Sequence, residues 1–184
     1  MELYGSYTSP YVRHCRIVLM ETGVDCTFIE IDHAASAENS PTRRMPFLRD
    51  EGITLTDSSS IVKYLRNKAG LVFLEDVAEY DHFCMINTAL DTTVNLFMLE
   101  KDGVTPEKSP YLMRQKQRVV STLEALDKQP LPAQAPYNDA ELRLACYLGW
   151  ALFRKQVDLK PYPNLERFLK AVDNYDYFRV TAPR

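Results

Sequence analysis

The sequence predicts a small α/β sandwich with a mixed four-stranded sheet over residues 1–70, followed by an all-helical part over residues 71–184. Three observations lead to this prediction. Short β-like runs alternate with helical runs in the first 70 residues, and two of the β-like runs flank an acidic turn that contains glycine. Beyond Leu71, apolar residues recur only at intervals of three and four.

The first three elements are expected to be a strand, a helix and a strand. Glu2-Leu-Tyr-Gly is a short strand candidate. The following helix begins at Pro10, because a missing N–H costs nothing at the first helical position, with Ser9 as its N-cap and Gly23 at its end. Residues 26–31 form the second strand. A right-handed crossover makes the two strands parallel.

The next elements are a hairpin and a second helix. After an irregular polar segment over residues 33–44, a third strand begins at Met45-Pro46 and is followed by an Asp-Glu-Gly turn at residues 50–52. Residues 53–55 return as the fourth strand, and Asp57-Ser-Ser-Ser opens a helix. The predicted order is therefore β-α-β, an irregular segment, then β-β-α.

The second part of the chain is predicted to be a helical bundle. Its helices are indicated by apolar residues at helical spacing and are separated by two proline-rich loops, residues 105–110 and 129–136. The spaced apolar residues are Phe83, Ile86, Leu90, Val94, Phe97, Leu112, Val119, Leu123 and Leu126, and two further helices cover residues 142–153 and 165–172.

Composition excludes several classes of function. The 184 residues contain 22 Lys plus Arg against 25 Asp plus Glu, a net charge of -3, so a nucleic-acid partner is not expected. The longest apolar run, residues 145–153, is far short of the roughly 18 residues that span a bilayer, and the start lacks the features of a signal peptide, so we expect a cytoplasmic protein without a membrane partner. The cysteines have no CxxC spacing, which predicts reduced thiols and no metal site: Cys15, Cys26, Cys84 and Cys146.

Three short motifs could take part in ligand binding or catalysis. Ser9 at a helix start is placed to hold an anion, although spacing alone favours a simple N-cap. Met45-Pro46 at a strand entrance is by default an ordinary proline; a cis bond there would leave the backbone of Met45 free to pair with an extended ligand. Asp57-Ser58 either caps its helix or holds the head group of an α-amino acid.

The joint order of these motifs resembles the cytosolic glutathione transferase family, of the bacterial, serine-type or theta-like kind. Ser9-Pro-Tyr-Val follows a first strand, Ser40-Pro-Thr-Arg-Arg-Met-Pro is similar to the family's Asn-Pro-x-Gly-Lys-Val-Pro, and Asp57-Ser58 is similar to its acidic-Ser pair. In the helical half, Asn138-Asp-Ala-Glu141 looks like the family's capping box. The resemblance covers the whole chain.

The resemblance implies a thioredoxin-like domain over residues 1–70, with a mixed four-stranded sheet, that binds glutathione as co-substrate, and an all-α domain over residues 71–184 that contributes most of a pocket for an electrophile. Ser9 would activate the glutathione thiol. Met45 and Pro46 would bind the cysteinyl backbone, Asp57 and Ser58 the γ-glutamyl end, and Arg44 the glycyl end. The second substrate would contact Tyr7, Tyr11, Phe97 and Tyr111.

Several other residues are assigned either to the site or to the core. Tyr7 is a rival for Ser9 in activating the thiol, whereas Tyr4, inside a strand, is expected in the core. Cys15 is expected to pack, since it is set back from the helix N-terminus where the field is strongest. Arg13 is expected to be structural or interfacial. Helical spacing assigns Tyr147, Trp150 and Phe153 to the core.

The implied activity is conjugation of glutathione to a small hydrophobic electrophile, a detoxification reaction, by a homodimer. One alternative is a non-catalytic protein of this fold that acts through protein contacts, as stringent starvation proteins do. Another is a glutathione-dependent isomerase of the maleylacetoacetate type. Its Ser-Ser-Cys signature would fall on Thr8-Ser9-Pro10, which disfavours this alternative.

Overall fold

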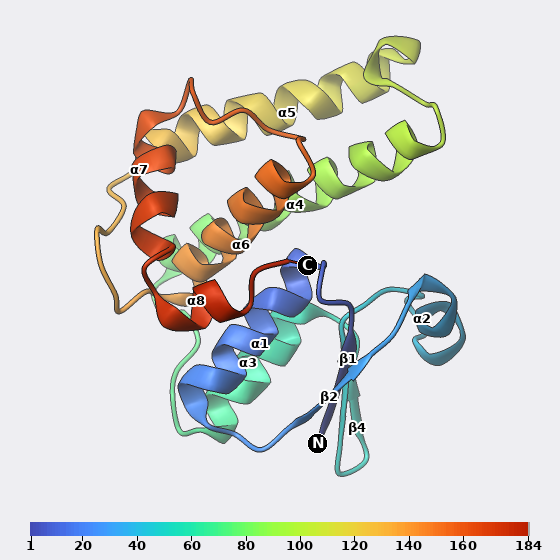
Figure 1. The fold of residues 1–184 in the computed structure, drawn as a ribbon, viewed down its shortest axis with the longest axis vertical. Helices are drawn as coiled ribbons and strands as arrows, with labels where there is room; N and C mark the ends of the chain where they lie inside the picture. The colour runs from blue at the N-terminus through green and yellow to red at the C-terminus, as the bar shows by residue number, and fades with distance from the viewer. Residues whose placement is uncertain (184) are drawn as a thin grey trace. The chain divides into compact units, whose positions relative to one another are not determined.

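The computed structural model describes residues 1–183. By internal contacts the chain divides into two compact units, one formed by Met1–Glu75 with Asn174–Arg184 and the other by Asp76–Asp173. Figure 1 shows the sheet in the first unit and the long helices in the second. The domain boundaries inferred from sequence, 1–70 and 71–184, stay a prediction; by contacts, the C-terminal tail groups with the first unit.

The first unit contains a mixed sheet, as predicted. Strand β1 (Glu2–Gly5) pairs in parallel with β2 (Thr27–Glu30) and antiparallel with β3 (Phe47–Asp50), which in turn pairs with β4 (Ile53–Leu55). The strand order is β2-β1-β3-β4. Helices α1 (Pro10–Thr22) and α3 (Ser58–Lys68) pack against each other. The element order confirms the α/β arrangement with a mixed sheet, and it is the thioredoxin-like fold that the resemblance implied.

A close approach between strand and helix sets the geometry of the first unit. A Cβ atom on Gly5 would lie 2.4 Å from Cγ2 of Val12, whose side chain is fully buried. Only a residue without a Cβ therefore lets the end of β1 lie so close to the first turn of α1. Leu3 and Leu48, paired on the same face of the sheet, are also fully buried.

The opposite face of the sheet is less covered, and this corrects the assignment of Tyr4 to the core. Tyr4 stacks on Phe47 with ring centroids 4.5 Å apart but stays partly exposed, and its hydroxyl donates to Glu2. The guanidinium of Arg49 lies 5.2 Å from the Tyr4 ring. Because side chains alternate along a strand, Tyr4 points away from the face that carries Leu3.

The segment expected to be irregular contains a short helix, α2 (His33–Asn39). Asp32 caps it by accepting a hydrogen bond from the backbone N–H of Ala35 at 2.8 Å. Only Ser36 of this helix is buried, so the segment shows no apolar periodicity in the sequence. Arg49 donates to the carbonyl of Asn39 at 3.3 Å and so ties the end of the helix to β3.

The C-terminal tail is held on α1 by buried polar contacts. Arg13 is nearly fully buried, donates to the carbonyl of Phe178 at 2.6 Å, and lies 3.5 Å from the centre of the Phe178 ring in the short helix α8 (Asp176–Val180). Tyr175 donates to Glu21 at 2.6 Å, and Glu21 also pairs with Arg66 of α3. The structural role expected for Arg13 is therefore found.

The second unit is helical, as predicted. Its packed pairs are α4 with α5 and α6, and α7 with α5 and α6. The helices are α4 (Val77–Lys101), α5 (Pro110–Asp127), α6 (Asp139–Phe153) and α7 (Pro163–Val172), with a short 3₁₀ turn, η1 (Pro106–Lys108), before α5. Within residues 1–183, no helix is both long and apolar enough to cross a bilayer.

Helix α6 is the central element of this unit. Asn138 accepts a hydrogen bond from the N–H of Glu141 at 2.9 Å, and the Glu141 carboxylate accepts the N–H of Asn138 at 2.7 Å, which is the expected capping box. Tyr147 is buried and shares a hydrogen bond with Thr93; burial raises its pKa to about 12. Trp150 is buried too.

Phe153 does not follow this pattern. It lies at the last position of α6, and its side chain is 47% exposed, so assigning it to the core was wrong. Helical spacing identifies one face of a helix. It does not tell whether another element still covers that face at the helix end.

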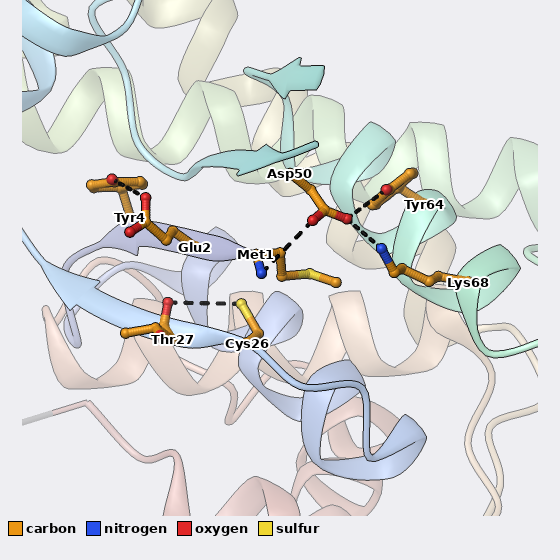
Figure 2. A network of polar contacts seen from close by, with 8 residues as sticks. All are labelled: Met1, Glu2, Tyr4, Cys26, Thr27, Asp50, Tyr64 and Lys68. Carbon is orange, nitrogen blue, oxygen red and sulfur yellow. Dashed lines mark hydrogen bonds and ion pairs between the residues drawn. The ribbon is translucent and has the colours of Figure 1, made fainter. Parts of the chain in front are cut away.

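A polar network joins the end of β3 to α3 and to the amino group of Met1, and Figure 2 shows it from close by. The Asp50 carboxylate, mostly buried, accepts from the hydroxyl of Tyr64 at 2.7 Å, pairs with the ammonium of Lys68, and lies 3.7 Å from the amino group of Met1. The hydrogen bond from Lys68 and then that from Tyr64 lower the pKa of the Asp50 carboxyl below its ordinary range, and the contact with Asp50 raises the pKa of both partners.

We expect Asp50→Asn to destabilise the protein at neutral pH, with the difference from wild type shrinking as the pH falls. A carboxyl whose pKa is lowered on folding stabilises the folded state above its unfolded pKa, about 3.9, and the stabilisation is lost as pH drops through the folded value. Urea unfolding from pH 7 down to about pH 3 measures this. The exposed Asp25→Asn is the control. A pH-independent difference would contradict the account.

We expect Gly5→Ala to lower the free energy of unfolding by about 1–3 kcal/mol, the usual cost of overpacking a core. The added methyl carbon would lie 2.4 Å from Cγ2 of Val12, so the strand or the helix would have to shift. Adding Val12→Ala to Gly5→Ala opens space, so the double variant should lose less than the sum of the two single losses. Strictly additive losses in urea unfolding would mean that the two residues do not contact each other.

Candidate functional site

The candidate site begins at the turn between β1 and α1. Ser9 is the N-cap of α1, with extended backbone angles, and Pro10 occupies the first helical position. The Ser9 N–H donates to the carbonyl of Ser6 at 3.1 Å. The hydroxyls of Ser6 and Thr8 lie 3.0 Å apart, and the Ser6 hydroxyl also accepts the N–H of Thr8. The turn that carries Ser9 is therefore held by its own hydrogen bonds.

The hydroxyl proton of Ser9 is available to a ligand. Its oxygen accepts the N–H of Val12 at 3.4 Å, a long bond that uses a lone pair and not the proton. Within residues 1–183 the hydroxyl has no other partner. A hydroxyl donor at the positive end of a helix can stabilise an anion such as a thiolate.

The second part of the site is the start of β3. The Met45–Pro46 bond is cis, the form in which the backbone of Met45 was expected to be free. Met45 is half-buried and precedes Phe47, which pairs with Tyr4 near the end of β1. Among the described residues, neither the N–H nor the C=O of Met45 has a hydrogen-bond partner. These two groups can pair with an extended peptide-like molecule.

The third part is the N-terminus of α3. Asp57 is exposed, and one of its carboxylate oxygens accepts the N–H groups of Ser59 at 2.8 Å and Ser60 at 3.4 Å. Ser58 is buried, and its carbonyl accepts the thiol of Cys15 at 3.9 Å. The Cys15 side chain thus joins α1 to the start of α3 and is buried packing, as expected.

Arg44 and Tyr11 connect the loop before β3 to the first turn of α1. The Arg44 guanidinium lies 5.9 Å from the centre of the Tyr11 ring, within the range of a cation–π contact. Tyr11 is half-buried, and Arg44 is exposed. Two of the residues predicted for the site are therefore neighbours, and one of them, Tyr11, is two positions along the chain from Ser9.

Tyr7 contacts β2 and α1, not the segment that contains Met45. Its ring is 4.9 Å from that of Phe28 in β2, and the Arg16 guanidinium lies 4.6 Å from its centre. Strand β2 is at the edge of the sheet opposite β4, whereas Met45 precedes β3. The contacts of Tyr7 therefore tie it to the β2 side.

Phe97 and Tyr111 belong to the second unit. The Phe97 ring meets Trp150 edge-on at 5.6 Å, and Arg154 lies 5.5 Å from its centre. Tyr111 is 57% exposed in the first turn of α5. Their assignment to a second-substrate pocket stays a prediction.

Sequence reasoning missed the residues that shape the Ser9 turn. Nothing in the sequence distinguishes Ser6 and Thr8 from ordinary loop residues, or Arg16 from other polar residues of its helix. Gly5 carried a usable signal, because a glycine at the end of a strand often marks the close approach of another backbone or side chain.

Comparison with known proteins gives a consistent result. Residues 3–72 match the family model of the glutathione S-transferase N-terminal domain. The chain is 28% identical over 199 residues to YibF, an uncharacterized GST-like protein of Escherichia coli (strain K12), and the match covers 100% of this chain and 98% of YibF.

Solved structures extend the likeness to the whole fold. A glutathione S-transferase of Methylobacillus flagellatus KT with glutathione bound matches with a TM-score of 0.85 and 25% identity, covering 100% of this chain and 99% of that one. A maleyl pyruvate isomerase, a bacterial glutathione S-transferase of the zeta class, matches in fold with a TM-score of 0.78 and 18% identity, over 100% and 97% of the two chains. Residues 3–72 thus match a glutathione S-transferase N-terminal domain, and the chain as a whole is similar in sequence and fold to glutathione S-transferases.

Proposed function

We propose that the protein binds glutathione in its first unit and activates the thiol for conjugation to a small hydrophobic electrophile. The observation that carries the proposal is the Ser9 hydroxyl, which caps α1 through its oxygen and keeps its proton for a ligand. The relative from Methylobacillus flagellatus, which has glutathione bound, supports the choice of ligand.

The proposed pose uses the three parts of the site. The cysteinyl backbone of glutathione pairs with the N–H and C=O of Met45, next to Pro46. The γ-glutamyl ammonium meets the Asp57 carboxylate, and its carboxylate meets Ser58 at the start of α3. Arg44 attracts the glycyl carboxylate.

The proposed chemistry is a displacement by sulfur. A free thiol ionises near 8.5, and the field of the α1 N-terminus together with the donated O–H of Ser9 favours the thiolate, whose proton passes to water. The thiolate forms a C–S bond to the electrophilic carbon, and the leaving group departs with its electron pair. Holding both reactants side by side lowers the barrier further.

Tyr7, Tyr11, Phe97 and Tyr111 are proposed contacts of the second substrate. Their aromatic rings suit a hydrophobic electrophile. The homodimer and a role in detoxification are proposed from the resemblance to the family alone, and the cytoplasmic location from the sequence features given above. Because the Ser-Ser-Cys signature is absent at Thr8-Ser9-Pro10, we do not favour the isomerase.

We expect Ser9→Ala to lower kcat for glutathione and 1-chloro-2,4-dinitrobenzene by roughly 10- to 100-fold, because one hydrogen bond to a charged group contributes about 1.5–3 kcal/mol. The pKa of bound glutathione, followed by thiolate absorbance, should rise by at least about one unit. The loss of the cap also costs about 1 kcal/mol of stability, so thermal unfolding is measured alongside.

Two variants control this experiment. Ser9→Thr keeps a hydroxyl and a cap, and should recover most of the turnover. Tyr7→Phe should leave the thiol pKa unchanged. If Tyr7→Phe raises the pKa and Ser9→Ala does not, Tyr7 activates the thiol. If wild-type protein neither binds immobilised glutathione nor turns over, the non-catalytic alternative holds.

We expect Asp57→Asn to raise the KM for glutathione about tenfold with little change in stability. Asn caps a helix as well as Asp does, so the bonds to Ser59 and Ser60 survive while the charge that meets the ligand ammonium is lost. Steady-state kinetics and thermal unfolding separate the two effects. An unchanged KM would place the γ-glutamyl end elsewhere.

A further inference from the structure

The C-terminal tail, residues 174–183, lies along α1 and belongs to the same unit. Figure 1 shows α8 beside α1, and the two helices are in contact. Tyr175 donates to Glu21 in the last turn of α1 at 2.6 Å, whereas the carbonyl of Phe178 accepts from Arg13 in the first turn. The tail therefore has two anchors on this helix, one at each end.

The anchor at the first turn is buried and consists of three contacts. The Arg13 guanidinium donates to the carbonyl of Phe178 at 2.6 Å and to the hydroxyl oxygen of Thr181 at 3.4 Å, and its carbon lies 3.5 Å from the centre of the Phe178 ring. Thr181 is fully buried, and its hydroxyl donates to the carbonyl of Tyr177 at 2.7 Å, so its oxygen is held in place as an acceptor. The tail thus fixes the Arg13 side chain in one orientation.

Both anchors use a charge at the end of α1 where the helix dipole disfavours it. Acidic side chains stabilise the N-terminus of a helix, and basic side chains stabilise the C-terminus. The first turn of α1 contains no acidic residue and includes Arg13, and the last turn contains no basic residue and includes Glu21. These two residues are therefore explained by what they hold, which is the tail and, for Glu21, also Arg66 of α3.

The first anchor lies in the turn that Ser9 caps. The N–H of Arg13 donates to the carbonyl of Ser9 at 3.0 Å, and the N–H of Val12 donates to the Ser9 hydroxyl oxygen at 3.4 Å. The first turn of a helix opens easily, because its N–H groups have no partners within the helix. Here two elements hold it: β1 through the approach of Gly5 to Val12, and the tail through Arg13.

We propose that Arg13 is a positioning residue for Ser9, and that the C-terminal tail sets the orientation of the Ser9 hydroxyl by holding Arg13. The inference rests on the proposed role of Ser9 in activating glutathione. Without the anchor, the first turn would open more often, and the cap and the free N–H groups of α1 would stabilise a thiolate less. The tail would then support the chemistry without contacting a ligand.

The first measurement is the pKa of bound glutathione, followed by thiolate absorbance. Phe178→Leu keeps an apolar side chain but removes the ring next to the Arg13 guanidinium, and we expect that pKa to rise by about half a unit, part of the shift expected for Ser9→Ala. Thr181→Val removes one acceptor of Arg13 and should raise it less. Tyr175→Phe is the matched control, because it releases the tail at the other end of α1. It should lower the melting temperature and leave the thiol pKa unchanged.

The second measurement needs no glutathione. Hydrogen exchange of backbone amides, followed by NMR, reports on the bond from the Arg13 N–H to the Ser9 carbonyl. Phe178→Leu should speed exchange of the Arg13 amide at least about threefold relative to the amides of β1, the same ratio as half a pKa unit. Tyr175→Phe should leave this relative rate unchanged.

The inference is overturned if Phe178→Leu and Thr181→Val both leave the thiol pKa at the wild-type value. It is also overturned if Tyr175→Phe shifts that pKa as far as Phe178→Leu does, because the shift would then follow from lost stability alone. If wild-type protein binds no glutathione, the proposed function fails, and the exchange rate decides whether the tail holds the turn of Ser9. An unchanged relative rate for the Arg13 amide in Phe178→Leu would then overturn the inference.

Discussion

The contact between Gly5 and Val12 is the constraint on which the rest of the first unit depends. Because Gly5 has no Cβ, the end of β1 and the first turn of α1 lie in direct contact, and the chain between them is a short turn. That turn carries Ser9. The register of β1 with β3 brings the segment that starts at Met45 to the same end of the sheet. The candidate site is thus a consequence of strand pairing and one close approach.

Local features of the site were predictable, because each follows from neighbouring residues in the chain. Ser9 before Pro10, and Asp57 before a run of serines, are N-cap patterns, and both residues cap their helices. The parallel direction of β1 and β2 followed from the β-α-β start, and the pairing of β3 with β4 from the acidic turn with Gly52. The capping box of Asn138 was expected from the family's pattern and is present.

Features that depend on contacts across the chain were not predictable. A structural or interfacial role was expected for Arg13, but the sequence did not identify its partner: the guanidinium is buried on Phe178, 165 positions later, and holds the tail against α1. Helix α2 has almost no buried face, so apolar spacing could not identify it. Tyr4 was expected in the core because it lies inside a strand. Side chains alternate between the two faces of a sheet, and the sequence of one strand does not tell which face is covered by helices.

The central claim is that the sulfur of glutathione lies at the N-terminus of α1, within reach of Ser9. A crystal structure of the protein with glutathione tests it most directly. The account predicts the sulfur within hydrogen-bond distance of the Ser9 hydroxyl, with the cysteinyl backbone paired to Met45. A glutathione molecule whose sulfur points away from α1, or a site that stays empty at saturating concentration, would contradict it.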